Sequence, residues 1–304
     1  MIGHEAWMVA MYRISIVGSG TVGEIVGAGF SKLGYDVTFY DVDKKRVDEL
    51  SSRGYRSTLT IAEAVKGSDV SFISVPTPTV NDKMDTSYLI DAVEHVAGTL
   101  REKSGYHVVV VKSTVLPTTT EKVVVPTLEK HAEKRVGAEI GVCVNPEFLT
   151  EIHRSWTDTQ SFARDFFSEE RIVIGELDKK SGNVVEQLYK PLNKPVFRTD
   201  LKTAEVIKYA SNCALASRIS YWNEIYYVCQ RLGADSDFVA KVVGMDARIG
   251  KYGTVHGKAF GGTCLPKDLK AFISFSESLG YEPRLLKAVD EVNERIKRDR
   301  GVRE

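Results

Sequence analysis

The feature that most constrains this chain is a glycine pattern close to its start. A short β-rich run, R-I-S-I-V at residues 13–17, leads directly into G-S-G-T-V-G at residues 18–23. An apolar-periodic segment typical of a helix reaches about Leu33, and a second strand-like run at residues 36–40 ends at Asp41. Strand, glycine turn, helix, strand and acid in this order predict a βαβ unit that binds a dinucleotide.

The same pattern indicates which dinucleotide is bound. Gly18, Gly20 and Gly23 leave bare backbone at the turn, so a pyrophosphate can approach the N-terminus of the helix. Asp41 is placed to accept hydrogen bonds from an adenosine ribose, and its carboxylate would repel a 2′-phosphate. The alternative is a turn whose glycines serve only tight packing, with Asp41 a solvated loop acid. Because all the parts are in register, we interpret the pattern as a site for NAD rather than NADP.

The rest of the chain divides into a sheet-forming part and a helical part. Four further runs have the composition of buried strands: residues 70–75, 107–111, 140–144 and 171–175. Helical stretches separate most of them, which predicts an α/β fold with a doubly wound, mostly parallel sheet of the Rossmann type. Residues 201–232 contain no Pro or Gly and predict one long helix leading into an all-α central domain. We therefore place an NAD-binding domain at residues 1–200 and a helical central and dimerisation domain at residues 201–304.

Charge and composition exclude several classes of partner. The 304 residues include 41 basic and 41 acidic side chains, so no net field draws the chain to nucleic acid or to a membrane surface. No apolar run approaches the roughly 20 residues that span a bilayer, and the opening residues lack the pattern of a secretion signal. We expect a cytoplasmic protein with a small-molecule partner. The four cysteines are spaced neither as a disulfide framework nor as a C-x-x-C pair: Cys143, Cys213, Cys229 and Cys264.

The segment most suggestive of chemistry is F-G-G-T-C-L-P-K-D at residues 260–268. Cys264 stands next to glycines and close to Lys267, and a nearby cation favours the nucleophilic thiolate form of a cysteine. The alternative is a buried cysteine that packs as a small hydrophobic residue, which is our interpretation of the other three.

Two further patterns offer polar groups whose role the residues alone leave open. Lys208 and Asn212 are four positions apart in the predicted long helix, so they share a face and could hold an oxyanion together. The same spacing is more typical of a solvated stripe. In N-P-E-F-L-T-E, residues 145–151, Glu147 and Glu151 follow a strand, where one could orient water. Acids that merely favour a helix start are the plain alternative.

These segments, taken in order, resemble the signatures of the UDP-glucose/GDP-mannose 6-dehydrogenases. The shared elements are the glycine turn, an S-T-V turn, N-P-E-F-L-x-E, K-x-x-x-N and G-G-x-C-x-P-K-D, and the resemblance covers residues 13–298. It implies an oxidoreductase that oxidises the primary alcohol of a nucleotide sugar twice, with two NAD, one water and no metal. Among such reactions, we expect the oxidation of UDP-glucose to UDP-glucuronate.

The resemblance also implies catalytic roles. Lys208 and Asp268 would position a water that helps take the alcohol proton, and Cys264 would attack the resulting aldehyde. Lys208 and Asn212 would steady the oxyanion while the thiohemiacetal becomes a thioester. Three residues are implied for the final hydrolysis: Glu151, Asp268 and Thr114.

Two sets of binding residues are implied in the same way. For the cofactor they are Gly18, Gly20, Thr21, Val22, Gly23, Asp41, Arg46, Pro76, Thr77, Thr114 and Lys267. For the substrate they are Glu147, Phe148, Leu149, Lys208, Asn212, Tyr252 and Gly261. Arg46 has an alternative interpretation as a solvated helix cation. The glycine-rich segment at residues 244–262 departs from the family by lacking an Asn-Pro element.

The family pattern continues beyond residue 298 into a second Rossmann-like domain that binds the nucleotide, and this sequence stops before it. Because binding energy on a remote nucleotide supports chemistry at the sugar, we expect weak or no oxidation by this chain alone. The predicted helix at residues 201–232 is apolar on more than one face, which together with the family predicts a homodimer.

Two other functions stay open at this stage. A β-hydroxyacid dehydrogenase has about this length and also uses a Lys and an Asn four apart, but its single oxidation needs no covalent thiol. A catalytically incomplete NAD-binding subunit or sensor is the other alternative.

Overall fold

The structure is a computed structural model that describes residues 12–80, 83–150, 156, 165–262 and 264–300. The chain forms two compact units that interleave in sequence. Unit 1 consists of the described residues of Met1–Thr77, Thr86–Glu147 and Asp165–Glu205. Unit 2 consists of those of Pro78–Asp85, Phe148–Arg164 and Val206–Glu304. In the part of the chain that the structure describes, no helix is long and apolar enough to cross a membrane.

Unit 1 is built around an eight-stranded sheet with the order β10-β9-β8-β7-β4-β1-β2-β3. Its strands are β1 (Arg13–Val17), β2 (Asp36–Tyr40), β3 (Arg56–Thr58), β4 (Val70–Ile73), β7 (His107–Val111), β8 (Ile140–Val144), β9 (Ile172–Glu176) and β10 (Val196–Thr199). All neighbouring strands pair in parallel except β8 and β9. The predicted mostly parallel sheet is confirmed. β4 ends at Ile73 rather than at residue 75, because the chain leaves the sheet there in a turn that contains Pro76 and Pro78.

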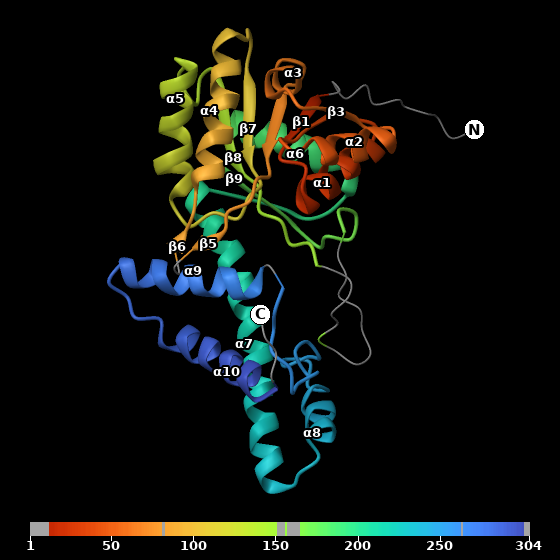
Figure 1. Ribbon diagram of the computed structural model, residues 1–304, viewed down its shortest axis with the longest axis vertical. Coiled ribbons are helices and arrows are strands. Elements are labelled where there is room, and N and C mark those ends of the chain that lie inside the picture. Colours follow the sequence, from red (N-terminus) through yellow and green to blue (C-terminus); the bar gives the residue numbers. More distant parts are fainter. Residues whose placement is uncertain (1–11, 81–82, 151–155, 157–164, 263, 301–304) are drawn as a thin grey trace, which may run out of the picture. The chain divides into compact units, whose positions relative to one another are not determined.

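Helices cover both faces of this sheet, as the alternation of strands and helices requires. They are α1 (Thr21–Lys32), α2 (Lys44–Ser52), α3 (Ile61–Lys66), α4 (Ser87–Glu102), a π-helical turn (Thr120–Val124), α5 (Val125–Ala132), α6 (Lys179–Tyr189) and a 3-10 turn (Lys190–Leu192). Phe30 of α1 and Tyr189 of α6 join Ile16 and Phe72 in one core cluster. Figure 1 shows α4 and α5 on the opposite side of the sheet from α1 and α6. Every residue of β7 and β8 is buried, as expected of strands covered on both faces.

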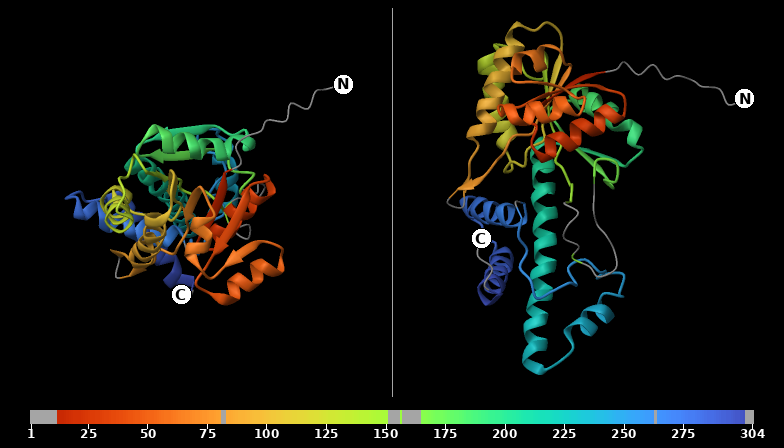
Figure 2. Two further views of the ribbon diagram at one scale, coloured as in Figure 1. Left: turned by 90° about the horizontal axis from the view of Figure 1, so that it is seen from above. Right: turned by 45° about the vertical axis from the view of Figure 1, so that its right-hand side comes forward.

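The described part of unit 2 is mostly helical, with one hairpin, formed by β5 (Thr79–Val80) and β6 (Lys83–Met84), and an irregular segment at residues 244–262. Its helices are α7 (Leu201–Leu232), α8 (Ser236–Val243), α9 (Leu265–Ser278) and α10 (Arg284–Arg300). The long helix has the predicted bounds, and Figure 2 shows it unbroken; it begins in unit 1 and continues in unit 2 after Glu205. Phe260 is buried in a second core cluster with side chains of α7, α9 and α10: Ala216, Ile219, Leu269 and Val289.

Candidate active site

The glycine turn of unit 1 lies between the end of β1 and the start of α1. Gly18 has a φ of +89°, and a Cβ there would lie 2.6 Å from the carbonyl oxygen of Ser74. A Cβ on Gly23 would lie 2.0 Å from the carbonyl oxygen of Gly18. Gly20 differs, since no described atom lies within 4 Å of the place its Cβ would take. Open backbone beside a helix N-terminus is what a pyrophosphate requires, so this turn, with Thr21 and Val22 starting α1, fits NAD.

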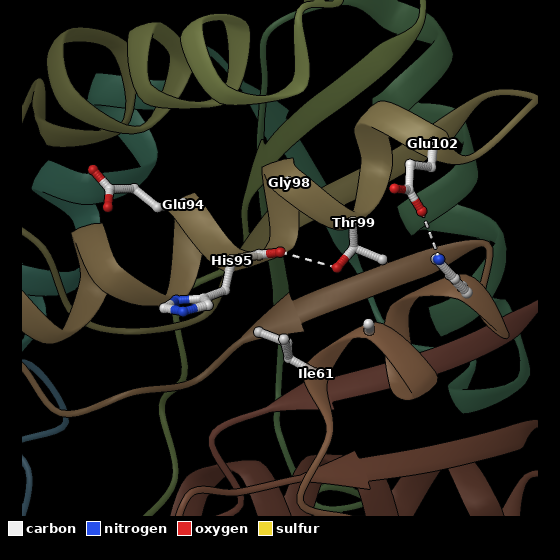
Figure 3. A pocket seen from close by; sticks show the side chains of 8 residues that line it. Ile61, Glu94, His95, Gly98, Thr99 and Glu102 are labelled. Carbon is white, nitrogen blue, oxygen red and sulfur yellow. Dashed lines mark hydrogen bonds and ion pairs between the residues drawn. The ribbon is translucent and has the colours of Figure 1, made fainter.

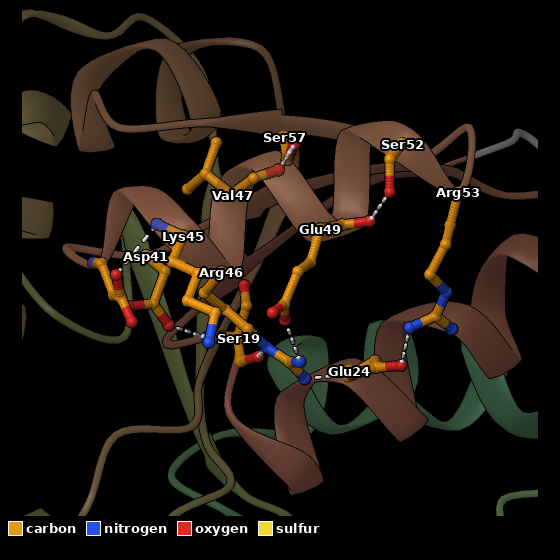
Figure 4. Close-up of polar contacts among 11 residues, drawn as sticks. Ser19, Glu24, Asp41, Lys45, Arg46, Val47, Glu49, Ser52, Arg53 and Ser57 are labelled. Atoms are coloured by element: carbon orange, nitrogen blue, oxygen red, sulfur yellow. Dashed lines mark hydrogen bonds and ion pairs between the residues drawn. The ribbon is translucent and has the colours of Figure 1, made fainter.

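Asp41 lies at the end of β2, beside this turn. Its carboxylate accepts hydrogen bonds from the backbone N–H groups of Ser19 (2.8 Å) and Asp43 (3.0 Å). A carboxylate has about four acceptor positions, so these two bonds leave capacity for ribose hydroxyls. Arg46 of α2 donates from Nε to the Ser19 carbonyl oxygen (2.6 Å) and forms an ion pair with Glu24 (Figure 4). Its guanidinium is therefore held at the turn by protein groups.

Two further turns meet at the carboxyl ends of β4 and β7. The Thr77 hydroxyl donates to the Thr114 carbonyl oxygen (2.7 Å), and the Ser113 hydroxyl donates to the Val75 carbonyl oxygen (2.7 Å). Pro76 between them is exposed. The predicted cofactor residues Pro76, Thr77 and Thr114 thus lie on the same edge of the sheet as the glycine turn, because β1, β4 and β7 run in parallel.

A buried lysine at this edge, Lys112, is not among the predicted site residues. Lys112 Nζ donates to Asn145 Oδ1 (2.9 Å), and the Tyr189 hydroxyl donates to the same oxygen (2.6 Å). Asn145 Nδ2 donates to the Val173 carbonyl oxygen (2.8 Å), so one amide joins three neighbouring elements. The signal was a lysine that directly follows the all-apolar run at residues 108–111. The cluster fixes the segment that carries Glu147, which is itself buried.

Cys264 of unit 2 is exposed and forms the N-cap of α9. The backbone N–H of Asp268 donates to the Cys264 carbonyl oxygen (2.9 Å), which closes the first helical turn. A helix N-terminus favours negative charge, so this position suits a thiolate.

Polar side chains of α7 and α9 are buried together one turn after Cys264. The Asp268 carboxylate, 1% exposed, accepts from Asn212 Nδ2 (2.6 Å) and from Lys267 Nζ (2.6 Å). Lys208 lies one turn before Asn212 on α7 and is also buried, with its Nζ 5.6 Å from the centre of the Phe148 ring. Burial of an amide and a carboxylate is costly unless they are hydrogen-bonded, as Asn212 and Asp268 are to each other, while the partly exposed Lys267 pairs with the same carboxylate.

The glycine-rich segment that holds Tyr252 and Gly261 is fixed by three side chains that sequence reasoning did not single out. Arg218 donates to the Tyr252 carbonyl oxygen (3.1 Å). Asn223 Nδ2 donates to the Lys258 carbonyl oxygen (2.9 Å), and its Oδ1 accepts from the Gly257 N–H (2.8 Å). Asn293 pairs in the same two-bond manner with the backbone of Phe260. An irregular segment thus satisfies its backbone through the helices beside it.

The other cysteines behave as predicted. Cys143, Cys213 and Cys229 are all buried. Burial raises the pKa of the Cys143 thiol to about 12. The pKa of Cys213 is also raised to about 12, mainly by burial and to a smaller extent by the negative charge of Asp268. Cys143 and Cys213 therefore remain thiols at neutral pH, and Cys229 is buried, which leaves the exposed Cys264 as the candidate nucleophile.

Unit 1 has a surface depression of about 430 Å³ that is separate from the predicted site residues (Figure 3). It lies between α3 and α4, and none of the predicted site residues lines it. Its acid Glu102 pairs with Lys66 (2.8 Å). No group of three or more His, Cys, Asp or Glu in the described residues is placed to hold a metal ion. The predicted Glu151 lies outside the described residues.

Comparison with known families finds two adjoining matches. Residues 51–193 match the NAD-binding domain of the UDP-glucose/GDP-mannose dehydrogenase family, and residues 202–295 match its central domain.

Individual relatives agree with these matches. A UDP-glucose 6-dehydrogenase of Haloferax volcanii is 35% identical over 93% of this chain and 69% of its own length. A GDP-mannose 6-dehydrogenase of Pseudomonas savastanoi pv. phaseolicola is 36% identical over 91% of this chain and 67% of its own length. Among solved structures, a UDP-glucose dehydrogenase from Pyrobaculum islandicum has a TM-score of 0.87 at 37% identity, covering 98% of this chain and 71% of that one. GDP-mannose dehydrogenase from Pseudomonas aeruginosa has a TM-score of 0.71 at 32% identity, covering 94% and 69%.

Proposed function

This chain belongs to the UDP-glucose/GDP-mannose dehydrogenase family of NAD-dependent oxidoreductases. We propose that it oxidises a nucleotide sugar to the uronate, with UDP-glucose as the first candidate substrate. The observation that carries this proposal is the exposed Cys264 one helical turn before Asp268, whose buried carboxylate is bonded to Asn212. A single oxidation of an alcohol needs no thiol. An oxidation that continues from aldehyde to carboxylate does, because the thiol keeps the aldehyde bound between the two steps.

The cofactor is held by the glycine turn, by Asp41 and by the turn with Thr77 in this proposal. NAD supplies the two-electron acceptor for each oxidation. Gly20 leaves the pyrophosphate room beside the N-terminus of α1, and Asp41 accepts hydrogen bonds from the ribose hydroxyls.

Cys264 then carries the covalent part of the reaction. A water positioned by Lys208 and Asp268 takes the proton of the primary alcohol as it becomes an aldehyde. The Cys264 sulfur forms a bond to the aldehyde carbon, and the carbonyl oxygen becomes the oxyanion of a thiohemiacetal. Lys208 and Asn212 donate to that oxygen while the second oxidation yields a thioester.

Hydrolysis releases the product and restores the thiol. Water adds to the thioester carbon, the carbon–sulfur bond breaks, and Cys264 takes a proton as the carboxylate leaves. Asp268 and Glu151 position the water in this proposal, with Thr114 in the supporting network. Substrate contacts are assigned to the following residues: Glu147, Phe148, Leu149, Tyr252 and Gly261.

The proposal includes a cytoplasmic homodimer. Large apolar side chains are exposed along the second half of α7, among them Tyr221 (53%) and Leu232 (76%), and such a surface favours a partner. Light scattering tests the dimer, and a monomeric mass contradicts it.

The deciding experiment measures NADH formed per sugar consumed. Native chain and Cys264→Ala are compared with UDP-glucose, GDP-mannose and UDP-N-acetylmannosamine as substrates. Two NADH per sugar, abolished by Cys264→Ala, support the thioester route and identify the sugar. One NADH per sugar that survives the substitution favours a single-step dehydrogenase. NADH binding without any turnover favours a subunit or sensor.

A further inference from the structure

Two oppositely charged side chains beside the glycine turn favour different cofactors: Asp41 favours NAD and Arg46 favours NADP. Asp41 suits NAD, since its carboxylate repels a 2′-phosphate, whereas an arginine at this place is what NADP-binding Rossmann domains use to hold that phosphate. Both side chains bond the same residue of the turn. Ser19 donates its N–H to Asp41 (2.8 Å), and its carbonyl oxygen accepts from Arg46 Nε (2.6 Å). The site therefore contains a cation able to attract the phosphate that Asp41 rejects.

Glu24 of α1 engages that cation. One oxygen of its carboxylate pairs with Arg46, and the other pairs with Arg53 at the end of α2 (Figure 4). Glu49 adds a longer contact to Arg46 (3.3 Å). The side chains of Glu24 and Arg46 are only 19% and 25% exposed, so solvent and salt screen this pair less than a surface ion pair.

We propose that Glu24 is a positioning residue for cofactor specificity. It holds Arg46 against the carbonyl oxygen of the turn and neutralises its charge, and thereby withholds from a 2′-phosphate the donor that would bind it. The preference for NAD then depends on two carboxylates, Asp41 directly and Glu24 through Arg46. This inference rests on the NAD site described above and not on the oxidation chemistry.

The test measures how tightly the full chain binds NADH and NADPH, by calorimetric titration at low, fixed ionic strength. The variants are Asp41→Asn, Glu24→Gln and the two combined. Asp41→Asn alone gives a modest gain in NADPH affinity relative to NADH, because Arg46 stays paired. In the double variant, the gain in NADPH affinity relative to NADH exceeds the product of the gains in the two single variants by about fivefold. An excess of this size is expected of coupled neighbouring residues. Adding Arg46→Gln to the double variant removes this excess.

A matched control separates a specific effect from a general change of charge. Asp48→Asn removes one negative charge, as Glu24→Gln does, but from an exposed residue of α2 that pairs with Lys44 (2.6 Å). Combined with Asp41→Asn, it leaves the relative affinities at the Asp41→Asn value. Thermal unfolding of each variant checks that the fold is retained, because a merely structural Glu24 would change stability but not the ratio of the two affinities.

Three outcomes overturn the inference: single effects that multiply without excess, an equal gain with Asp48→Asn, or native protein that binds NADH and NADPH alike. Native protein that prefers NADH but oxidises no sugar contradicts the proposed reaction and leaves this inference in place.

Discussion

The glycine turn of unit 1 and the Cys264 region of unit 2 are built from different parts of the polypeptide. The turn is made of backbone from one stretch of sequence. Its geometry is possible only because Gly18 and Gly23 have no side chain. The Cys264 region depends on side chains from two helices, since Asn212 and Asp268 are 56 residues apart in sequence. The first should therefore be sensitive to a single methyl group, and the second to the loss of a charge or an amide.

The largest effect is expected for Gly23→Ala. The added methyl would lie 2.0 Å from the Gly18 carbonyl oxygen, so strand and helix must separate. We expect the free energy of unfolding to fall by about 3 kcal/mol and NADH binding to be lost. Urea unfolding and NADH titration measure the two quantities.

Gly20→Ala is the matched control for this comparison. It has room among the described residues, so the free energy of unfolding should change by less than about 0.5 kcal/mol. NADH affinity should still fall, because the methyl occupies the place assigned to the pyrophosphate. Equal destabilisation by both substitutions would break the distinction between the two glycines.

The corresponding substitution in unit 2 is Asp268→Ala. It leaves the buried Asn212 amide without this acceptor and separates Lys267 from its carboxylate. We expect a loss of about 2 to 3 kcal/mol in urea unfolding, below the cost of a fully buried pair because a quarter of the Lys267 side chain is exposed. Asp246→Ala, which breaks an exposed pair with Arg248, should leave stability unchanged. Equal effects would show that burial does not set the cost.

Unit 1 also contains a buried cluster made of side chains, and its response to pH sharpens the comparison. His107 Nε2 bonds the Ser71 hydroxyl (2.8 Å) and Nδ1 bonds Lys103 Nζ (3.1 Å). Burial lowers the pKa of His107 to about 3. The positive charges of Lys103 and Lys134 add to this lowering, and the negative charge of Asp69 opposes it. The unfolded chain, with a pKa of about 6.5, binds the proton first, so stability falls as pH decreases from about 6.5 towards 3.

Between pH 6.5 and pH 5 this histidine should cost about 2 kcal/mol in the free energy of unfolding. His107→Gln keeps a donor for Ser71 and does not titrate, so its unfolding curve should change less over this interval. An identical pH dependence in both proteins would assign the acid sensitivity to other groups.

The smallest effect is expected at the glycine-rich segment of unit 2. Asn293→Ala removes the partner of both the N–H and the carbonyl oxygen of buried Phe260, which should cost about 1 to 2 kcal/mol. Asn183→Ala, on the exposed face of α6, serves as the comparison in the same unfolding measurement. A cost no larger than that of Asn183→Ala would mean that the segment keeps its conformation without Asn293.

Local patterns predicted those features that depend on neighbouring residues. The strands at residues 13–17, 36–40, 107–111 and 140–144 and the helix at 201–232 were found with the predicted bounds. Short runs rich in apolar and β-branched residues predicted the strands, and the absence of Pro and Gly predicted the helix, and both signals lie within the segment itself. The short strands β3 and β10 and the hairpin β5–β6 were not predicted, since so few residues carry no readable period.

The sequence by itself predicted a dinucleotide-binding turn at residues 18–23 and singled out Cys264 as the candidate nucleophile. The turn is specified by glycines within six residues, 18–23, whose missing side chains are visible in the sequence. Only the tertiary structure decided that Asn212 and Lys267 share the carboxylate of Asp268, and that Glu24 holds Arg46 against the turn. The pairs Asn212–Asp268 and Glu24–Arg46 each join two different helices, and packing of the folded chain, rather than local propensity, brings them within hydrogen-bond distance.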